Sequence, residues 1–256
     1  MESPRDRRTV RSVLLELLDP LRADWRACIY SAVALGLLLV WLHQGQRAFF
    51  ALHLASTLVP GASPAEIEWW GTIYQFAAAS LLFLAIPALL LKCAAGERLR
   101  DLGLGLGDRR FGLLVVVLGW LLIALPSGIS AATMAEFRAE YPLAKLAASD
   151  APRFLVYELA YGLLYYVAYE SFFRGFVQLG LARRVGHLNA ILIQTAITTL
   201  LHIGKPQGEI WSALAAGFLF GIIVVRTRSV WPLVLVHWGL GAVTDIACAH
   251  ASGILS

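Results

Sequence analysis

Charged residues are scarce in this chain of 256 residues. Only 15% of the residues are Asp, Glu, Lys or Arg, and 59% are hydrophobic, whereas soluble domains contain about 25% charged and about 45–50% apolar residues. This composition argues against a water-soluble globule of this size. We therefore expect one integral membrane domain, an all-α polytopic bundle of helices.

Cysteine is also rare, and phosphate-binding loops are missing. The three cysteines have neither paired spacing nor metal-ligand spacing, which argues against a disulfide framework and a cysteine zinc site. Neither a GxGxxG element nor a Walker-type loop occurs. The net charge of +4 needs no nucleic-acid partner, because cytoplasmic loops of membrane proteins collect positive residues for reasons of insertion.

Long apolar runs predict about seven transmembrane helices. Most runs approach the roughly 20 residues that cross about 30 Å of hydrocarbon as a helix. The first run starts late and follows an arginine-rich segment suited to a short interfacial helix, so we expect an uncleaved span. The runs cover residues 27–43, 69–91, 111–134, 154–182, 188–203, 211–225 and 230–249.

The distribution of Lys and Arg predicts a cytoplasmic N-terminus. With seven spans, the segments expected inside hold fifteen of the 21 basic residues and those expected outside hold five, as the positive-inside rule requires. The remaining one, Arg174, lies in the middle of a span. We expect a multi-pass protein of the cell (inner) membrane. Its predicted parts are a cytoplasmic or interfacial segment 1–26, front helices 27–152 with a basic cytoplasmic loop 92–110, a core 153–249 and a tail 250–256.

Ionisable side chains inside the predicted spans gather in the back half of the chain. Such a group in hydrocarbon is costly unless it is paired or faces a wet cavity, so each one marks a functional site by default. Taken together, they are the ingredients of a polar site that holds and activates water. They are Glu170 and Arg174 on the fourth span, His202 at the outer end of the fifth, Glu209 opening the sixth, and His237 and Asp245 on the seventh.

Each of these residues also has a purely structural interpretation. Glu170 and Arg174 are four residues apart on one helix face, where an ion pair would pin the bundle. Gly175, directly after them, would let another helix approach closely. A single His in a span is often hydrogen-bonded to a neighbouring helix, and Glu209 just after a proline suits a first helical turn. Taken singly, the residues leave this alternative open.

At these residues the sequence resembles the CAAX prenyl endopeptidase and bacteriocin-processing (CPBP, or Abi) family of intramembrane proteases. The family's motifs are Glu-Glu-x-x-x-Arg, Phe-x-x-x-His and His-x-x-x-Asn on successive helices. Three positions depart from these motifs, because Tyr, Thr and Gly stand where the first Glu, the Phe and the Asn are expected. The matching segments are Tyr169-Glu170-Ser171-Phe172-Phe173-Arg174, Thr198-x-x-x-His202 and His237-x-x-x-Gly241.

The resemblance implies an intramembrane endopeptidase that acts on a membrane-associated protein or peptide, as in CAAX or bacteriocin processing. In the family, the first Glu activates water, the second holds the Arg, and the histidines and the Asn stabilise the oxyanion or bind zinc. Some members combine a single Glu with His-x-Gly-Lys-Pro-x-x-Glu, which matches the segment from His202 to Glu209. Glu209 could thus supply the carboxylate that the first Glu of the first motif provides in the family. Asp245 could take the place of the Asn as a polar anchor.

The residues and the resemblance together predict a peptidase in which Glu170 or Glu209 takes a proton from a water that attacks a peptide carbonyl. His202 and His237 would donate hydrogen bonds to the oxyanion. Arg174 would fix Glu170 and keep it ionised. We favour Glu170 as the base because it lies deeper in its span. If Glu170 is locked to Arg174, Glu209 is the better base.

Three alternatives stay open. A zinc version would use His202, His237 and Glu170, but no HExxH pair gives a local zinc signature, and we prefer the metal-free mechanism. A catalytically silent member that acts as a membrane interaction or immunity protein is favoured by Tyr169 and Gly241. A small-solute transporter would also place charges in the membrane, although no inverted repeat occurs. The expected partners are a membrane protein or peptide substrate, lipidated in the CAAX case, and the bilayer, with no nucleic acid.

Overall fold

Helices make up all the regular structure of the described residues. A computed structural model of the chain describes residues 10–23, 25–95 and 98–254, and every regular element in these ranges is helical. The all-α fold predicted from the sequence is confirmed. Part of the predicted N-terminal segment with Arg5, Arg7 and Arg8, residues 96–97 of the basic loop and residues 255–256 of the tail lie outside the described residues.

Four helices of the described part are long and apolar enough to cross a membrane, and a fifth arises if one bent pair counts as a single span. All five coincide with runs expected from the sequence. The predicted count of seven and the cytoplasmic N-terminus stay predictions. The five are Pro64–Cys93, Arg109–Ala131, Gln207–Thr227, Trp231–Ala251 and the pair Cys28–Gln44 with Arg47–Leu58, which is bent by 46°.

The other two predicted runs are helical but differ from ordinary spans. The run at 154–182 lies in an uninterrupted helical stretch from 151 to 185, whose tyrosines and charged side chains reduce its hydropathy. The run at 188–203 forms a helix of only 14 residues, α13 (His187–Leu200). A helix of that length rises about 21 Å, less than the hydrocarbon thickness of about 30 Å. It reaches its position by packing against neighbouring helices.

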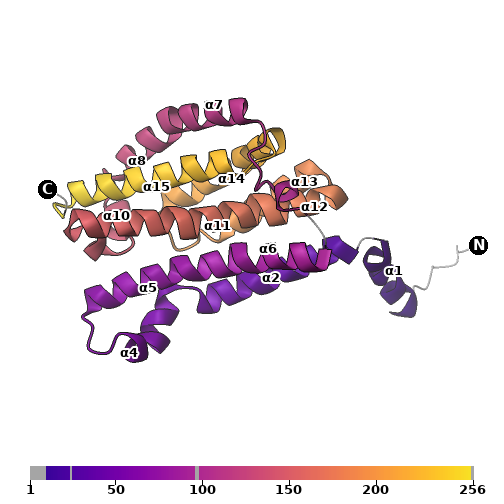
Figure 1. The fold of residues 1–256 in the computed structure, drawn as a ribbon, viewed down its shortest axis with the longest axis horizontal. Coiled ribbons are helices and arrows are strands. Elements are labelled where there is room, and N and C mark those ends of the chain that lie inside the picture. The colour runs from indigo at the N-terminus through magenta and orange to yellow at the C-terminus, as the bar shows by residue number, and fades with distance from the viewer. Residues whose placement is uncertain (1–9, 24, 96–97, 255–256) are drawn as a thin grey trace, which may run out of the picture.

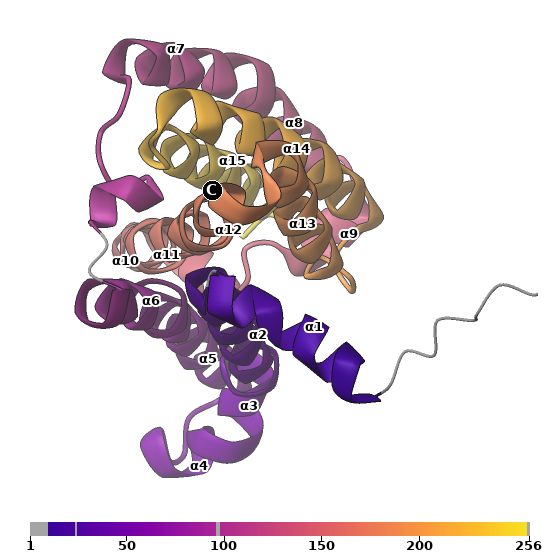
Figure 2. The same ribbon diagram turned by 90° about the vertical axis from the view of Figure 1, so that its right-hand side faces the viewer.

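The stretch 151–185, called the central stretch below, lies between two groups of helices (Figures 1 and 2). The front helices α2, α5 and α6 lie on one side of it, and α13, α14 and α15 pack on the other, with α7 and α8 packed on the outer side of α15. The central stretch comprises α10 (Ala151–Ala160), α11 (Val167–Glu170) and α12 (Gly180–Val185), joined by π-helical turns at Tyr161–Tyr166 and Ser171–Leu179. The flanking helices are α2 (Trp25–Gln44), α5 (Pro64–Ala79), α6 (Ile86–Leu90), α7 (Arg109–Gly119), α8 (Leu125–Ala131), α14 (Gln207–Thr227) and α15 (Trp231–Ala251).

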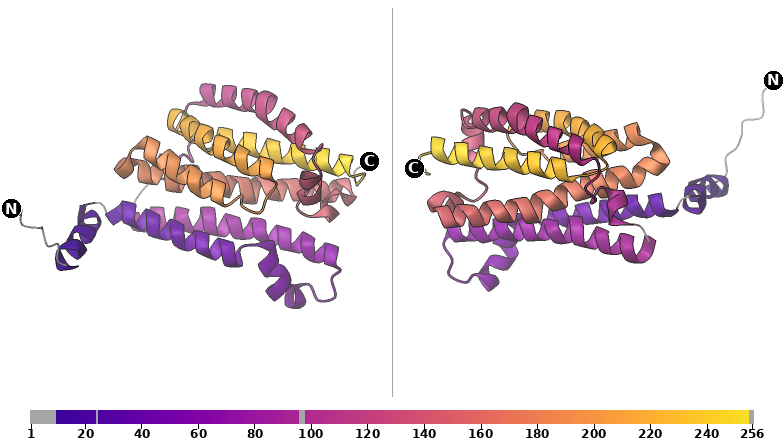
Figure 3. Two further views of the ribbon diagram at one scale, coloured as in Figure 1. Left: turned by 180° about the vertical axis from the view of Figure 1, so that it is seen from behind. Right: turned by 45° about the horizontal axis from the view of Figure 1, so that its top comes forward.

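Short elements complete the fold at its ends. The helix expected near the N-terminus forms as α1, which lies outside the bundle (Figure 3). Its exposed apolar side chains include Val13, Leu14 and Leu18, which suit the predicted interfacial position. These elements are α1 (Val10–Ala23), α3 (Arg47–Phe49), α4 (Ala55–Leu58) and α9 (Ala135–Glu140), with 3-10 turns at Leu99–Leu102 and Lys145–Ser149.

Local sequence signals set several helix starts. Ser63 and Glu66 form a reciprocal capping box before α5, and Pro64 occupies the first turn. The carboxylate of Asp108 accepts a hydrogen bond from the backbone N–H of Phe111 at 3.1 Å at the start of α7. Asp150 caps α10 in the same way, at 2.8 Å from the N–H of Arg153. These caps fix where α5, α7 and α10 begin, and α5 and α10 belong to the part of the fold that surrounds the site.

Buried polar contacts hold the helices around the central stretch. The side-chain amide of Gln178 donates to the carbonyl of Gly221 at 2.9 Å, so the central stretch and α14 are joined by a hydrogen bond in an apolar surrounding. The close neighbour of Gly175 is the carbonyl of Leu102, which would lie 2.4 Å from an added Cβ. The segment that approaches Gly175 is therefore a short 3-10 turn rather than a spanning helix.

Candidate active site

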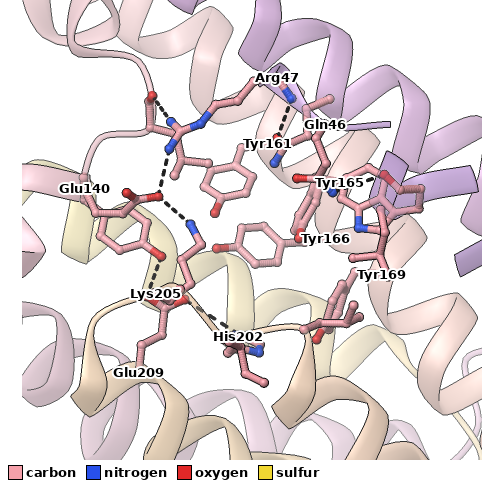
Figure 4. A pocket seen from close by; sticks show the side chains of 18 of the residues that line it. Gln46, Arg47, Glu140, Tyr161, Tyr165, Tyr166, Tyr169, His202, Lys205 and Glu209 are labelled. Carbon is pink, nitrogen blue, oxygen red and sulfur yellow. Dashed lines mark hydrogen bonds and ion pairs between the residues drawn. The ribbon is translucent and has the colours of Figure 1, made fainter. Parts of the chain in front are cut away.

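One cavity of about 440 Å³ joins the front and the back of the chain (Figure 4). Its walls come from the break between α2 and α3, from α5, from the end of α9, from the central stretch, from the turn between α13 and α14, and from α15. The volume falls in the range of about 300–1,000 Å³ that is typical of ligand sites. Three of the six predicted site residues line it, namely His202, Glu209 and His237.

A buried carboxylate lies behind His237. Nδ1 of His237 is 2.7 Å from Oε1 of Glu170, and Nε of Arg174 is 3.3 Å from Oε2 of the same carboxylate. Glu170 is 0% exposed and Arg174 is 3% exposed, so the ion pair expected from their spacing forms inside the bundle. Because Nδ1–H donates to Glu170, Nε2 is the nitrogen of His237 that is free to act in the cavity.

His202 is oriented by its own backbone turn. Its Nδ1 donates to the carbonyl of Thr198 at 2.7 Å, and its Nε2 lies 3.7 Å from Oε1 of Glu209. The contact with residue 198 uses a main-chain oxygen, so the replacement of an aromatic residue by Thr198 leaves this hydrogen bond intact. The second oxygen of Glu209, Oε2, accepts a hydrogen bond from the hydroxyl of Tyr141 at 2.8 Å.

The two candidate bases thus lie in different surroundings. Both oxygens of Glu170 are engaged, one by His237 and one by Arg174, and Glu170 does not line the cavity. Glu209 lines the cavity and is 19% exposed. From the sequence, Glu209 is expected to be the better base if Glu170 is locked to Arg174, and Glu170 is paired with Arg174 here. The greater depth of Glu170 places it behind His237, away from the space open to a substrate.

Tyrosines occupy the positions of two motif residues that this chain lacks. Tyr169, in place of the first Glu, lines the cavity, and its ring centroid is 5.6 Å from that of His237. A Cβ added at Gly241 would lie 2.3 Å from the hydroxyl oxygen of Tyr166. Tyr166 therefore fills the space where a side chain at position 241 would begin. Its ring centroid is 4.7 Å from that of His237.

Asp245 does not reach the cavity. Its side chain is fully buried beside Glu158 and Tyr157, and it does not line the cavity. The indole N–H of Trp238 donates to Oε2 of Glu158 at 3.3 Å, so this second acidic group lies between α10 and α15. The structure does not bring Asp245 to the place of the missing Asn, which Tyr166 occupies instead.

Three ionic residues at one edge of the cavity were missed or left unused by the sequence analysis. Oε1 of Glu140 accepts from Nη2 of Arg47 at 3.1 Å and from Nζ of Lys205 at 2.6 Å. Tyr141 was missed as well. These residues come from separate parts of the chain, so no local pattern links them. The tyrosines of the cavity wall did leave a signal, since Tyr161, Tyr165 and Tyr169 recur every four residues.

Glu140 is ionised at neutral pH. It is the last residue of α9, outside the spanning segments. Partial burial acts to raise the pKa of its carboxyl, but the nearby Lys205, Arg47 and Lys145 outweigh burial and hold that pKa below its ordinary value. The edge of the cavity therefore carries two cations that share one carboxylate.

No group of three His, Cys, Asp or Glu side chains in the described ranges is placed to hold a metal ion. In the predicted zinc set, Nδ1 of His237 and Oε1 of Glu170 are hydrogen-bonded to each other. Both oxygens of Glu170 are engaged by His237 and Arg174, and Glu170 does not line the cavity. The predicted zinc set is therefore not assembled around one point in this part of the chain.

The fold and the site define an α-helical integral membrane protein whose polar cavity holds side chains suited to acid and base chemistry. Residues 151–243 of the chain match the model of the Rce1-like family, described as type II CAAX prenyl endopeptidase Rce1-like. This match confirms the resemblance seen in the sequence, and it covers Glu170, Arg174, His202, Glu209 and His237. No curated protein and no solved structure matches the chain. The family implies an intramembrane endopeptidase with a protein substrate.

Proposed function

We propose that the protein is a metal-free intramembrane endopeptidase in which Glu209 is the general base. One observation carries this proposal: Glu209, His202 and His237 line the same cavity, while Glu170 is enclosed between Arg174 and His237. A general base must come within hydrogen-bond reach of the proton that it removes, directly or through one water. Glu209 meets that condition for a substrate in the cavity.

His202 and Glu209 together are suited to hold the attacking water. At 3.7 Å, Nε2 of His202 and Oε1 of Glu209 are too far apart for a direct hydrogen bond, and both can accept a hydrogen bond from one water beside them. In the neutral ring with Nδ1 protonated, Nε2 accepts a hydrogen bond, as does the carboxylate. Both acceptors therefore direct the water's lone pair toward a peptide carbonyl. Tyr141 holds the other carboxylate oxygen in place.

Each proton of the reaction has a carrier. The water oxygen forms a bond to the carbonyl carbon while its proton passes to Glu209. The carbonyl oxygen becomes an oxyanion, which the Nε2–H of a protonated His237 stabilises. When the C–N bond breaks, the nitrogen takes a proton, from His237 or from Glu209, and leaves as an amine. Glu170, behind Nδ1, stabilises the imidazolium form of His237, and Arg174 balances the charge of Glu170.

The proposed substrate is a membrane-associated protein or peptide of the CAAX-processing or bacteriocin-processing type. The family description, type II CAAX prenyl endopeptidase Rce1-like, supports the first type, including a lipidated substrate. The cavity lies among helices of membrane length, which favours a substrate that reaches it from the bilayer. We propose the cell (inner) membrane as its location, in line with the positive-inside pattern.

A second candidate function is a catalytically silent interaction or immunity protein. Tyr169 in place of a carboxylate and Tyr166 in the space beside Gly241 favour it. The two functions differ in whether the polar side chains of the cavity are required for a reaction. A silent protein needs none of them for chemistry, whereas the peptidase needs the carboxylate of Glu209 as its base.

The test is cleavage of a membrane substrate by purified protein in detergent or liposomes. Glu170, Glu209, His202 and His237 are replaced singly, and Glu136→Gln, an exposed glutamate away from the cavity, is the matched control. Loss of cleavage in the Glu209 and His237 variants supports the peptidase, and wild-type cleavage in all four overturns it. Metal analysis of the protein and cleavage after chelation test the zinc version, which predicts bound zinc and loss of activity.

A further inference from the structure

Three separate segments place a cationic pair at one edge of the cavity (Figure 4). Arg47 comes from α3 in the front of the chain, and Lys205 comes from the turn between α13 and α14. Both contact a single oxygen of Glu140, at 3.1 Å and 2.6 Å. Arg47 is fixed further by donation from Nη1 to the carbonyl of Leu143 at 2.6 Å. The pair is thus a built feature rather than two free surface side chains.

The edge of the cavity carries more positive than negative charge. Arg47 and Lys205 contribute two positive charges, and Glu140 contributes one negative charge. Glu209, the other carboxylate of the lining, directs its two oxygens toward Tyr141 and His202 rather than toward the two cations. The side chains of Arg47 and Lys205 are 34% and 30% exposed. A partly desolvated excess cation of this kind favours an anion in the ligand.

Hydrogen-bond donors remain available on both cations. An ammonium has three N–H donors and a guanidinium has five. Lys205 uses one donor on Glu140 in the described part of the chain. A carboxylate is the peptide group that matches a guanidinium and an ammonium side by side. In an apolar peptide, the group with that chemistry is the C-terminal carboxylate.

The same cavity leads from the cationic edge to the proposed base. Arg47, Lys205, Glu209 and His237 all line it. With about 440 Å³, the cavity lies at the lower end of ligand-site volumes of about 300–1,000 Å³. That space suits the last few residues of a peptide better than a continuous chain that passes through. A peptide end anchored at the cations would place an upstream bond near Glu209.

We propose that Arg47 and Lys205 bind the terminal carboxylate of the peptide substrate and so are specificity-determining residues of the proposed reaction. This inference rests on the proposed function for its catalytic consequence. It assigns a specificity role to Arg47, which lies outside the family-matched residues 151–243. Glu140 competes with the substrate carboxylate for the two cations.

The test uses two fluorescent peptides of one sequence with apolar last residues, one with a free C-terminal carboxylate and one with a C-terminal amide. Cleavage by the wild type is expected to favour the acid by about tenfold or more in kcat/KM, mainly through KM, because two charge-assisted contacts are lost in the amide. Arg47→Gln and Lys205→Met should abolish this preference, because each lowers kcat/KM for the acid peptide toward the value for the amide. Arg153→Gln, at an exposed arginine paired with Asp150, should keep it.

Glu140→Gln is expected to change the preference for the acid peptide in the opposite direction from Arg47→Gln and Lys205→Met. It removes the competing carboxylate, so the preference for the acid peptide should increase, a gain that a damaged fold would not produce. Binding of the same two peptides to the Glu209→Gln protein, followed by fluorescence anisotropy, gives a readout without catalysis. Equal binding of acid and amide overturns the inference even if cleavage occurs. Preferred binding of the acid without any cleavage supports the carboxylate site and counts against the peptidase function.

Discussion

Nδ1 of His237 on α15 donates to Oε1 of Glu170 on α11 across 2.7 Å, so the glutamate of the first motif orients the histidine of the third. Glu170 is in turn paired with Arg174 at 3.3 Å. The three side chains form one unit in which only the histidine reaches the cavity. This relationship favours a positioning role for Glu170, and it is the reason for proposing Glu209 as the base.

Replacing Glu170 is expected to damage the fold as well as the reaction. Glu170→Gln leaves the charge of Arg174 buried without a counter-charge, which typically costs about 3–5 kcal/mol. We expect a lower melting temperature in detergent and loss of cleavage. The double variant Glu170→Gln/Arg174→Met removes both charges and should recover part of the stability without recovering activity. A Glu170→Gln protein as stable as the wild type contradicts the ion-pair role.

Tyr141→Phe tests the hydrogen bond to Glu209. Loss of the hydroxyl removes the 2.8 Å contact to Oε2, and a hydrogen bond to a charged group contributes about 1.5–3 kcal/mol. We expect kcat to fall roughly tenfold or more with a smaller change in KM, since the aromatic ring still shapes the cavity. An unchanged kcat together with a changed KM assigns Tyr141 to substrate binding alone.

The space beside Gly241 can be tested by exchange. Gly241→Asn alone is expected to destabilise the protein by about 1–3 kcal/mol, because its Cβ meets the hydroxyl of Tyr166 at 2.3 Å. The double variant Tyr166→Ala/Gly241→Asn removes the clash and restores the family's third motif. Its loss of melting temperature should be smaller than the sum of the losses in Tyr166→Ala and Gly241→Asn. If the two substitutions are additive, Tyr166 does not fill this space.

The ion cluster at the edge of the cavity predicts a defined pH dependence of stability. The pKa of Glu140 lies below its ordinary value of 4.5, since Lys205, Arg47 and Lys145 outweigh burial. A depressed folded-state pKa stabilises the fold above pH 4.5, and that stabilisation is lost as the pH falls through the lowered value. The melting-temperature difference between wild type and Glu140→Gln should be constant from pH 7 to about 5 and vanish in stronger acid. A difference that grows on acidification contradicts this assignment.

Sequence patterns located the parts of the site that depend on local spacing. The i,i+4 relation of Glu170 and Arg174 and the position of Glu209 at a helix start are local features, and both appear in the structure. The number of membrane-spanning helices was harder to predict. The helix α13 is short for a span, and the central stretch is long enough but its tyrosines and charged residues lower its hydropathy. The number of apolar runs therefore exceeds the number of ordinary spans.

Long-range contacts were beyond a pattern-based prediction. Glu140 is 93 residues from Arg47 and 65 from Lys205, and no periodicity connects such positions. Likewise, Tyr166 filling the space at Gly241 depends on how two helices pack. Sequence patterns also could not decide between Glu170 and Glu209 as the base, because only the packed bundle shows which carboxylate faces the cavity.

Cleavage by the Glu209→Gln protein tests the role of Glu209 most directly. Glu→Gln keeps the size of the side chain and a hydrogen-bond acceptor for Tyr141 but removes the base. Loss of a general base costs about 10²–10⁴-fold in rate, so kcat should fall by at least about a hundredfold at an unchanged melting temperature, with Glu136→Gln equal to the wild type. Cleavage at the wild-type rate by Glu209→Gln contradicts the assignment of Glu209 as the base.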